Sequence, residues 1–224
     1  MNLENAADDI RYLLDRGYNQ EGAVEFVCAH YRLDKGSKHF LSRSVLSKEV
    51  SEKRQKKFLP CEMIKGNSIA IDGYNILIGL ESILEKKAFI CDDGVIRDNK
   101  GIFGNYETSE STETAIELIL QFLQEKTPSY VCFLFDSQIS KSGILAGKLK
   151  KKLDESGLKG DARTSKHADY TLKNSKYIVA SSDGVIIDEA ERVVNFLNCL
   201  VSRFGYLEEG VVRMQNTIRS SSSF

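Results

Sequence analysis

The sequence is poor in several features that would narrow its function at once. Among 224 residues it has no Trp, two Pro and three His, and its formal net charge is −1. A near-neutral chain has no global attraction to nucleic acid or to a membrane surface. No apolar stretch approaches the roughly 20 residues of a membrane helix. The acidic N-terminus, residues 1–9, does not resemble a signal peptide. We therefore expect a cytoplasmic protein with no membrane partner.

The cysteines and histidines form none of the familiar site spacings. Five cysteines are scattered along the chain without a CxxC pair, namely Cys28, Cys61, Cys91, Cys132 and Cys199. Zinc-site and disulfide spacing are both absent, which favours a reducing compartment and buried, apolar cysteines. The histidines show no zinc or triad spacing. A P-loop and a GxGxxG motif are also absent, which argues against nucleoside-triphosphate and dinucleotide enzymes.

Apolar periodicity predicts a small all-α module at the start of the chain. Helices are expected over residues 3–16, 20–31 and 37–58, and the third of these is basic. Pro60 closes this region. We therefore assign residues 1–62 to a basic helical N-terminal module. At the other end, the serine-rich residues 217–224 predict a disordered tail.

Residues 63–216 have the pattern of a three-layer α/β/α domain. Short apolar runs typical of buried parallel strands lie at 67–72, 130–135 and 177–182. Helical patterns lie at 75–86, 110–125, 143–155 and 188–204. The Asp93-Gly94 pair between two short apolar runs predicts a β-hairpin. Strands separated by helices favour a central, mainly parallel sheet.

Each of the three apolar runs leads into an aspartate, namely Asp72, Asp136 and Asp183. Ligands of open α/β sheets bind beyond the carboxyl ends of the strands, so these side chains are expected at one edge. Clustered carboxylates repel one another unless a divalent cation neutralises them. Mg²⁺ and Mn²⁺ prefer oxygen ligands and keep waters that can act as nucleophiles. The alternative is that each aspartate only caps the helix that follows it.

The segment Ile71-Asp-Gly-Tyr-Asn75 resembles the opening strand of the PIN-like nucleases, especially their NYN branch. Later segments match in order, including Glu113 near the start of a long helix, Leu134-Phe-Asp136, Ala168-Asp169 and Val179-Ala-Ser-Ser-Asp183. Flap-endonuclease-like relatives share the strand-end acid at Asp136. The whole chain also resembles a largely archaeal family with an N-terminal domain of unknown function 434 and a C-terminal PIN-like domain.

The resemblance implies a metal-dependent nuclease, with an endoribonuclease acting on RNA as the leading expectation and Mg²⁺ or Mn²⁺ as cofactor. The expected catalytic residues are Asp72, Asn75, Asp136 and Asp183. The expected metal ligands are Asp72, Asp136 and Asp183, with Asp169 and Glu113 at a second ion or its water and Asp188 as an outer ligand. Many flap-type relatives carry paired acids where this chain has Asp169 alone.

Two segments are strongly basic. Residues 32–57 hold nine Lys and Arg against three acids, and residues 141–176 hold ten against four, so each carries a net charge of +6. Such segments can supply the sequence-independent part of nucleic-acid affinity. The alternative is a solvated helix face. The residues expected to contact nucleic acid are Arg43, Arg54, Lys56, Lys57, Lys141, Lys150 and Lys151.

Two other functions stay open. One is an RNA-binding protein that kept the nuclease fold without its activity, and divalent-ion binding separates it from a nuclease. The other is a metal-dependent phosphatase, since strand-end aspartates also serve phosphoryl hydrolysis. The phosphatase is disfavoured because Asp136 is followed by Ser137-Gln138 rather than by a second aspartate two residues on.

Overall fold

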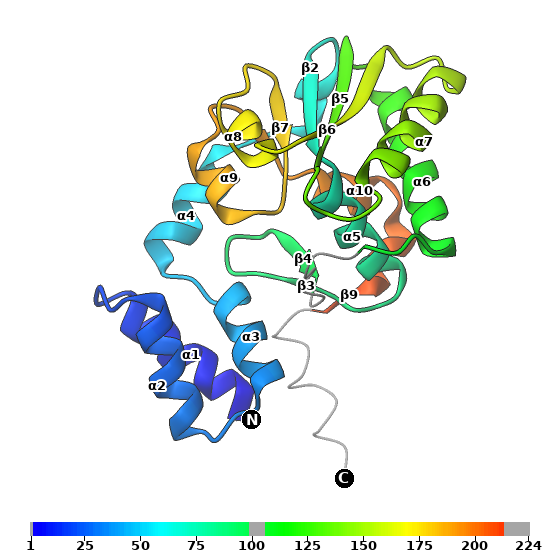
Figure 1. Cartoon of the computed structure of the whole chain (residues 1–224). Helices are drawn as coiled ribbons and strands as arrows, with labels where there is room; N and C mark the ends of the chain where they lie inside the picture. The colour runs from blue at the N-terminus through cyan, green and yellow to red at the C-terminus, as the bar shows by residue number, and fades with distance from the viewer. Residues whose placement is uncertain (1, 99–105, 213–224) are drawn as a thin grey trace.

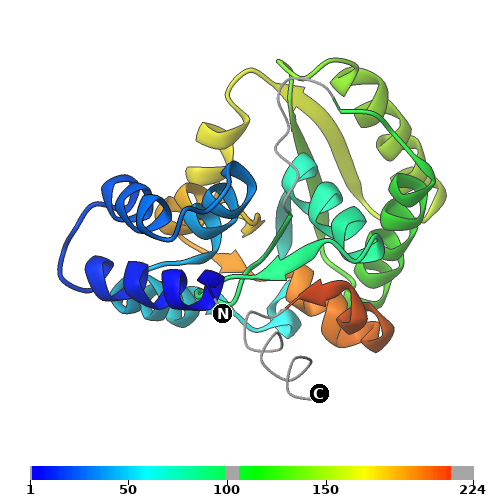
Figure 2. The same cartoon turned by 90° about the horizontal axis from the view of Figure 1, so that it is seen from below.

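The computed structural model describes residues 2–98 and 106–212, and it consists of a helical module beside an α/β domain (Figure 1). The module contains α1 (Asn2–Leu14), α2 (Gln20–His30), α3 (Lys35–Ser44) and α4 (Lys48–Lys57). Helices α1 to α3 share a small core of their own around Ile10, Val24 and Leu41. Figure 2 shows that the module lies on one side of the domain. The predicted tail, 217–224, lies outside the described residues.

The segment expected as one helix over 37–58 is two helices. Val45 is buried in the module core, and the backbone N–H of Leu46 donates to Asp92 Oδ2 at 3.1 Å. These contacts turn the chain, and Ser47 then caps α4 by accepting from the backbone N–H of Val50 at 3.3 Å. A serine at this position satisfies an N–H that would otherwise lack a partner.

The domain is built on a six-stranded parallel sheet in the order β1-β8-β7-β2-β5-β6. Its strands are β1 (Phe58–Leu59), β2 (Ser68–Asp72), β5 (Tyr130–Asp136), β6 (Gly160–Ser165), β7 (Ile178–Ala180) and β8 (Val193–Val194). Side chains alternate between the two faces of the sheet, as a strand period of two requires. Ile69, Ile71 and Phe133 face one core, whereas Ala70 and Leu134 face the other.

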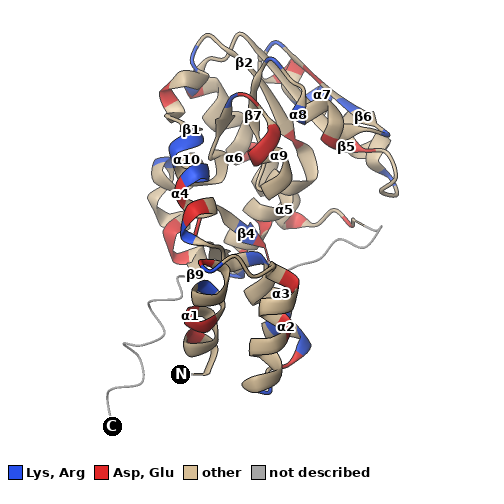
Figure 3. Ribbon diagram, turned by 90° about the vertical axis from the view of Figure 1, so that its left-hand side faces the viewer, with Lys and Arg blue, Asp and Glu red and all other residues tan. Residues whose placement is uncertain are grey.

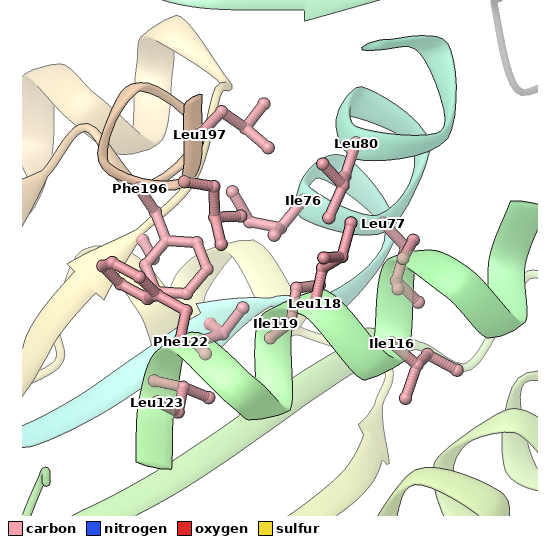
Figure 4. Close-up of a cluster of buried hydrophobic side chains, with 14 of the residues drawn as sticks. Ile76, Leu77, Leu80, Ile116, Leu118, Ile119, Phe122, Leu123, Phe196 and Leu197 are labelled. Carbon is pink, nitrogen blue, oxygen red and sulfur yellow. The ribbon is translucent and has the colours of Figure 1, made fainter. Parts of the chain in front are cut away.

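Helices cover both faces of this sheet. The larger core lies under α5 (Gly73–Leu84), α6 (Glu110–Lys126), α7 (Ser142–Glu155) and α10 (Phe196–Arg203). Figure 4 shows Leu77 of α5, Ile119 of α6 and Phe196 of α10 within it. The smaller core lies under α8 (Ala168–Lys173) and α9 (Gly184–Glu189). The expected three-layer α/β/α architecture with a parallel sheet and a helical N-terminal region is therefore confirmed.

A second, three-stranded sheet contains the expected hairpin. Strands β3 (Ala88–Ile90) and β4 (Ile96–Asp98) are antiparallel, and β9 (Val211–Val212) pairs in parallel with β3. Short 3₁₀ helices cover Cys61–Ile64 and Gly205–Gly210. No helix in the described part of the chain is long and apolar enough to cross a membrane.

Two further expectations from the sequence are wrong. The helix expected over 188–204 begins only at Phe196, because the β-branched pair Val193–Val194 forms β8 between β7 and β1. Cys61 and Cys199 form a disulfide with their Cα atoms 5.9 Å apart, although no spacing rule suggested a pair. The two cysteines are 138 residues apart in sequence, and only the fold brings them together.

The hairpin turn fastens the module to the domain. Asp93 is fully buried, and its carboxylate accepts from Arg54 of α4 at 2.9 Å and from Arg97 of β4 at 2.9 and 2.8 Å. Burial works to raise the pKa of Asp93, but the two guanidinium groups outweigh it and hold the pKa below its usual value. Beside it, Asp92 accepts two hydrogen bonds from Arg11 of α1, both at 2.8 Å.

We expect Asp93→Asn to lower the free energy of unfolding by about 3–5 kcal/mol, because it removes the counter-charge of buried Arg97 and one of the two carboxylates that pair with Arg54. Urea unfolding at pH 7 measures this. Asp154→Asn is the control, since that exposed residue pairs only along α7 with Lys150 and should change stability by about 0.5 kcal/mol or less. A loss below about 1 kcal/mol for Asp93→Asn would show that the cluster does not hold the interface.

Candidate active site

The carboxyl ends of the three central strands meet around Asp72, the last residue of β2. Strand β2 lies between β7 and β5, with Ile71 level with Ala180 and Asp72 level with Leu134. The chain runs outward from β2 through β5 to β6 and then returns to β7 on the opposite side of β2. The boundary between β2 and β7 is therefore a topological switch point, where open α/β sheets bind their ligands.

A pocket of about 230 Å³ opens at this edge of the sheet. Four of the predicted catalytic and metal-ligating residues line it, namely Asp72, Asn75, Asp136 and Asp169. Arg43 of α3 and Asp98 of β4 line it as well. The pocket therefore joins the ends of two strands of the parallel sheet with a helix of the module and a strand of the hairpin.

Asp72 is a buried carboxylate of this site. Its side chain accepts hydrogen bonds from Ser181 Oγ and from Asn75 Nδ2, both at 2.7 Å, and the residue is 7% exposed. Burial raises the pKa of Asp72 to about 6, even though the hydrogen bonds from Ser181 and Asn75 lower it, and the charge of Asp169 raises it further. A carboxylate in this position gains from any cation that enters the pocket.

The residue after Asp72 has to be small. A Cβ atom on Gly73 would lie 2.3 Å from Cε1 of Phe135, so only glycine lets α5 start this close to β5. Tyr74 then packs edge-on against Phe135, with ring centroids 5.1 Å apart. This packing explains the Asp-Gly-Tyr-Asn sequence locally, because it starts α5 with Asp72 as its N-cap.

The other strand-end carboxylates are engaged to different degrees. Asp136 Oδ1 accepts from the backbone N–H of Gln138 at 2.8 Å. Asp183 Oδ1 accepts from the N–H groups of Val185 and Ile186 at 2.8 and 3.0 Å, so Asp183 caps α9. Asp183 does not line the pocket, but its charge acts on Asp169. Burial raises the pKa of Asp169, and the charges of Asp183 and Asp136 add to this effect.

The structure places two of the expected metal ligands elsewhere. Glu113 of α6 pairs with Lys148 and Lys152 of α7 and does not line the pocket. Asp188 of α9 accepts from Arg54 at 2.9 and 2.7 Å. Both carboxylates already have cationic partners, which a metal would have to displace.

Most of the expected nucleic-acid-binding residues contact other protein groups, and only some of them line a cavity. Arg54 is buried between Asp93 and Asp188, and Lys57 donates to the backbone oxygen of Asp188 at 2.6 Å. Lys56, Lys150 and Lys151 each pair with an acidic residue on the same helix. Lys141, at the start of α7, lines a neighbouring cavity of about 350 Å³ together with Tyr74. Arg43 is the one that lines the carboxylate pocket.

The pocket offers only hard oxygen donors at its acidic end, which suits Mg²⁺ or Mn²⁺. Within residues 2–98 and 106–212, however, no three His, Cys, Asp or Glu side chains are close enough to hold one ion as they stand. The donor set therefore fits a divalent cation by its chemistry and by the raised pKa of Asp72. Its side chains would have to draw together around the ion.

Sequence reasoning missed two residues of this site. Asp98 ends β4 in the same way that Asp72 ends β2, but the Asp-Gly pattern of the hairpin indicates only a turn. Ser181 lies in the Ala-Ser-Ser-Asp segment, in which the sequence predicts only Asp183 as a site residue. In the structure, Ser181 is the residue of this segment that donates a hydrogen bond to Asp72. The strand-end rule applied to Ile96-Arg97-Asp98 could have found the first of these.

The pKa of Asp72 predicts a pH dependence of stability. The folded state holds this proton more tightly, with a pKa of about 6 against an ordinary 3.8. The resulting stabilisation is fully present below pH 3.8 and is lost as the pH rises through 6. We expect a loss of about 3 kcal/mol without metal.

Asp72→Asn should remove this dependence and raise stability at pH 7.5 in the presence of a chelator. Urea unfolding between pH 4 and 7.5 measures both effects, with Asp154→Asn as the exposed control. Parallel stability curves for wild type and Asp72→Asn would contradict the expectation.

Comparison with known proteins finds two family matches along the chain. Residues 61–199 match the family described as "Domain of unknown function (DUF5616)", and residues 2–57 match "Protein of unknown function (DUF434)". The uncharacterized protein MJ0935 of Methanocaldococcus jannaschii is 36% identical over 210 residues, which cover 93% of this chain and 100% of that protein. No solved structure matches the chain. The candidate site thus lies mainly in a match that spans more than half of the chain, and the protein belongs to the DUF5616 family with a DUF434 region before it.

Proposed function

We propose that the protein is a metal-dependent nuclease that hydrolyses phosphodiester bonds of RNA. The observation that carries the proposal is the position of Asp72, Asp136 and Asp169 around one pocket at the switch point of a parallel sheet. Oxygen ligands gathered at such an edge are what phosphodiester-cleaving metal sites use. The order of motifs that resembles the PIN-like nucleases supports the same conclusion.

Each residue has a role that follows from its contacts. Asp72, Asp136 and Asp169 would hold Mg²⁺ or Mn²⁺, with Asp183 contributing charge through Asp169. When bound, a divalent ion supplies water activation and charge stabilisation. Asn75 and Ser181 orient the Asp72 carboxylate, since both donate to its Oδ2 at 2.7 Å. Asp72 Oδ1 accepts only a long hydrogen bond of 3.5 Å from the backbone N–H of Asn75, so this oxygen can still contact a ligand.

RNA is the proposed substrate because basic side chains accompany the acidic pocket. Figure 3 shows Lys and Arg on α7, the helix whose N-cap is Lys141. Lys141 lies beside Tyr74, which lines both the carboxylate pocket and the neighbouring cavity. A phosphodiester backbone could therefore pass from a basic rim into the acidic site.

One observation favours a second candidate, an RNA-binding protein without nuclease activity. In the described residues the carboxylates do not already form a three-ligand cluster. A pocket that never closes around an ion would bind the strand without cleaving it. Mn²⁺ titration calorimetry separates the two candidates, because only the nuclease requires the ion.

We expect Asp72→Asn and Asp136→Asn each to lower Mn²⁺-dependent RNA cleavage roughly a thousand-fold, a barrier increase of about 4 kcal/mol. Asparagine keeps the shape of the side chain but loses the charge that binds the ion. RNA binding should persist because the basic side chains supply it. Gel assays with single-stranded and structured RNA measure cleavage, and calorimetry measures Mn²⁺ binding.

Asp154→Asn is again the control and should cleave as wild type does. Equal cleavage by all variants would indicate a contaminating nuclease or another site. Absence of both cleavage and Mn²⁺ binding in wild type would favour the second candidate.

A further inference from the structure

Within residues 2–98 and 106–212, Arg43 is the one cation that lines the carboxylate pocket. It belongs to α3, within the DUF434 match, whereas the pocket's carboxylates all lie within the DUF5616 match. The pocket is therefore composite, and among the residues that the structure describes, the helical module supplies its only positive charge. The carboxylate motifs in the sequence do not by themselves predict that a residue of the helical module lines the pocket.

The arginines near the hairpin differ in how fully their donors are used. Arg11, Arg54 and Arg97 each make three hydrogen bonds of 2.7 to 2.9 Å. Among the described residues, Arg43 makes one, from Nη2 to Asp98 Oδ2 at 3.4 Å. A guanidinium carries five N–H donors. Arg43 thus has unused donors at the pocket, whereas the other three fasten the interface.

Asp98 holds this arginine in an unusual way. Asp98 is 4% exposed, and its Oδ1 has no hydrogen-bond partner among the described residues. Its one ion pair, to Arg43, is long and involves a single nitrogen, whereas strong Arg–carboxylate pairs are short and bidentate. A buried charge with so weak a contact keeps the guanidinium near without saturating it.

We infer that Arg43 binds the non-bridging oxygens of an RNA phosphate in the pocket and that Asp98 is a positioning residue for it. An entering phosphodiester meets the negative charges of Asp72, Asp136 and Asp169, so it needs a cationic partner from the protein. The planar guanidinium suits two phosphate oxygens at once, which a lysine cannot match. The inference rests on the proposed function, since it assigns a substrate contact at the same site.

The test measures binding where cleavage cannot interfere. The probe is a fluorescein-labelled single-stranded oligoribonucleotide, followed by anisotropy in Mn²⁺ with an Asp136→Asn parent protein. Arg43→Ala should weaken binding roughly tenfold and reduce the slope of log affinity against log salt by about one, as expected for one lost phosphate contact. Arg43→Lys should recover part of the affinity. Arg16→Ala, which removes an exposed arginine from the same module, should change neither quantity.

Asp98→Asn distinguishes positioning from simple charge. With Arg43 present, the substitution should weaken binding because the guanidinium loses its tether. With alanine at position 43, it should not weaken binding, since only a repelling charge has been removed. Stronger binding in both backgrounds would overturn the positioning role of Asp98. Melting curves confirm that each variant is folded, and Arg43→Lys tests the arginine without a change of charge.

The outcomes separate this inference from the nuclease proposal. Equal affinity and salt slope for Arg43→Ala and its parent would overturn the role of Arg43, whether or not wild type cleaves RNA. Arg43-dependent binding by a wild type that never cleaves would overturn the nuclease and leave the phosphate contact in place. No RNA binding by the parent would overturn both.

Discussion

The buried carboxylate of Asp93 sets the relative position of the module, the hairpin and the parallel sheet. It accepts from Arg54 of the module and from Arg97 of the hairpin, and Arg97 Nε also donates to the backbone oxygen of Ser182 at 2.9 Å. Ser182 follows Ser181, which holds Asp72. An unpaired charge at this depth costs several kcal/mol, so the three parts cannot shift independently without breaking the cluster. The pocket geometry depends on that constraint.

The same constraint explains how an acidic pocket can exist in a chain of nearly zero net charge. Asp72, Asp136 and Asp98 lie at strand ends that the sheet and hairpin bring to one pocket, and Asp169 reaches the same pocket from the first turn of α8. The resulting repulsion appears as the raised pKa of Asp72, after the larger effect of its burial. Folding tolerates this repulsion because the hydrophobic cores and the Asp93 cluster stabilise the rest of the molecule. A cation relieves it, whether a bound metal ion or the guanidinium of Arg43.

Local patterns in the sequence predicted the parts of the fold that local physics determines. The apolar run before Asp72, the periodic helix at 110–125 and the Asp-Gly hairpin all form as expected. The predictions that failed concern features that depend on contacts between residues far apart in the sequence. Val193–Val194 continues a helical pattern in sequence, yet pairing with β7 and β1 makes it a strand. Asp98 carries the same strand-end signal as Asp72, but only the approach of α3 shows that it borders the site.

The basic segment 32–57 shows why local net charge is a poor guide to a binding surface. Its count of +6 treats every lysine and arginine alike, but Arg54 neutralises buried Asp93 and Asp188, and Lys57 binds a backbone oxygen. These charges belong to the interface and are not available to a phosphate. Arg43 differs because its partner Asp98 accepts a single, long hydrogen bond from it. That one contact does not use up the donors of a guanidinium group. A residue's capacity to bind a ligand therefore follows from the donors that folding leaves unused, which no count of charges along the chain can reveal.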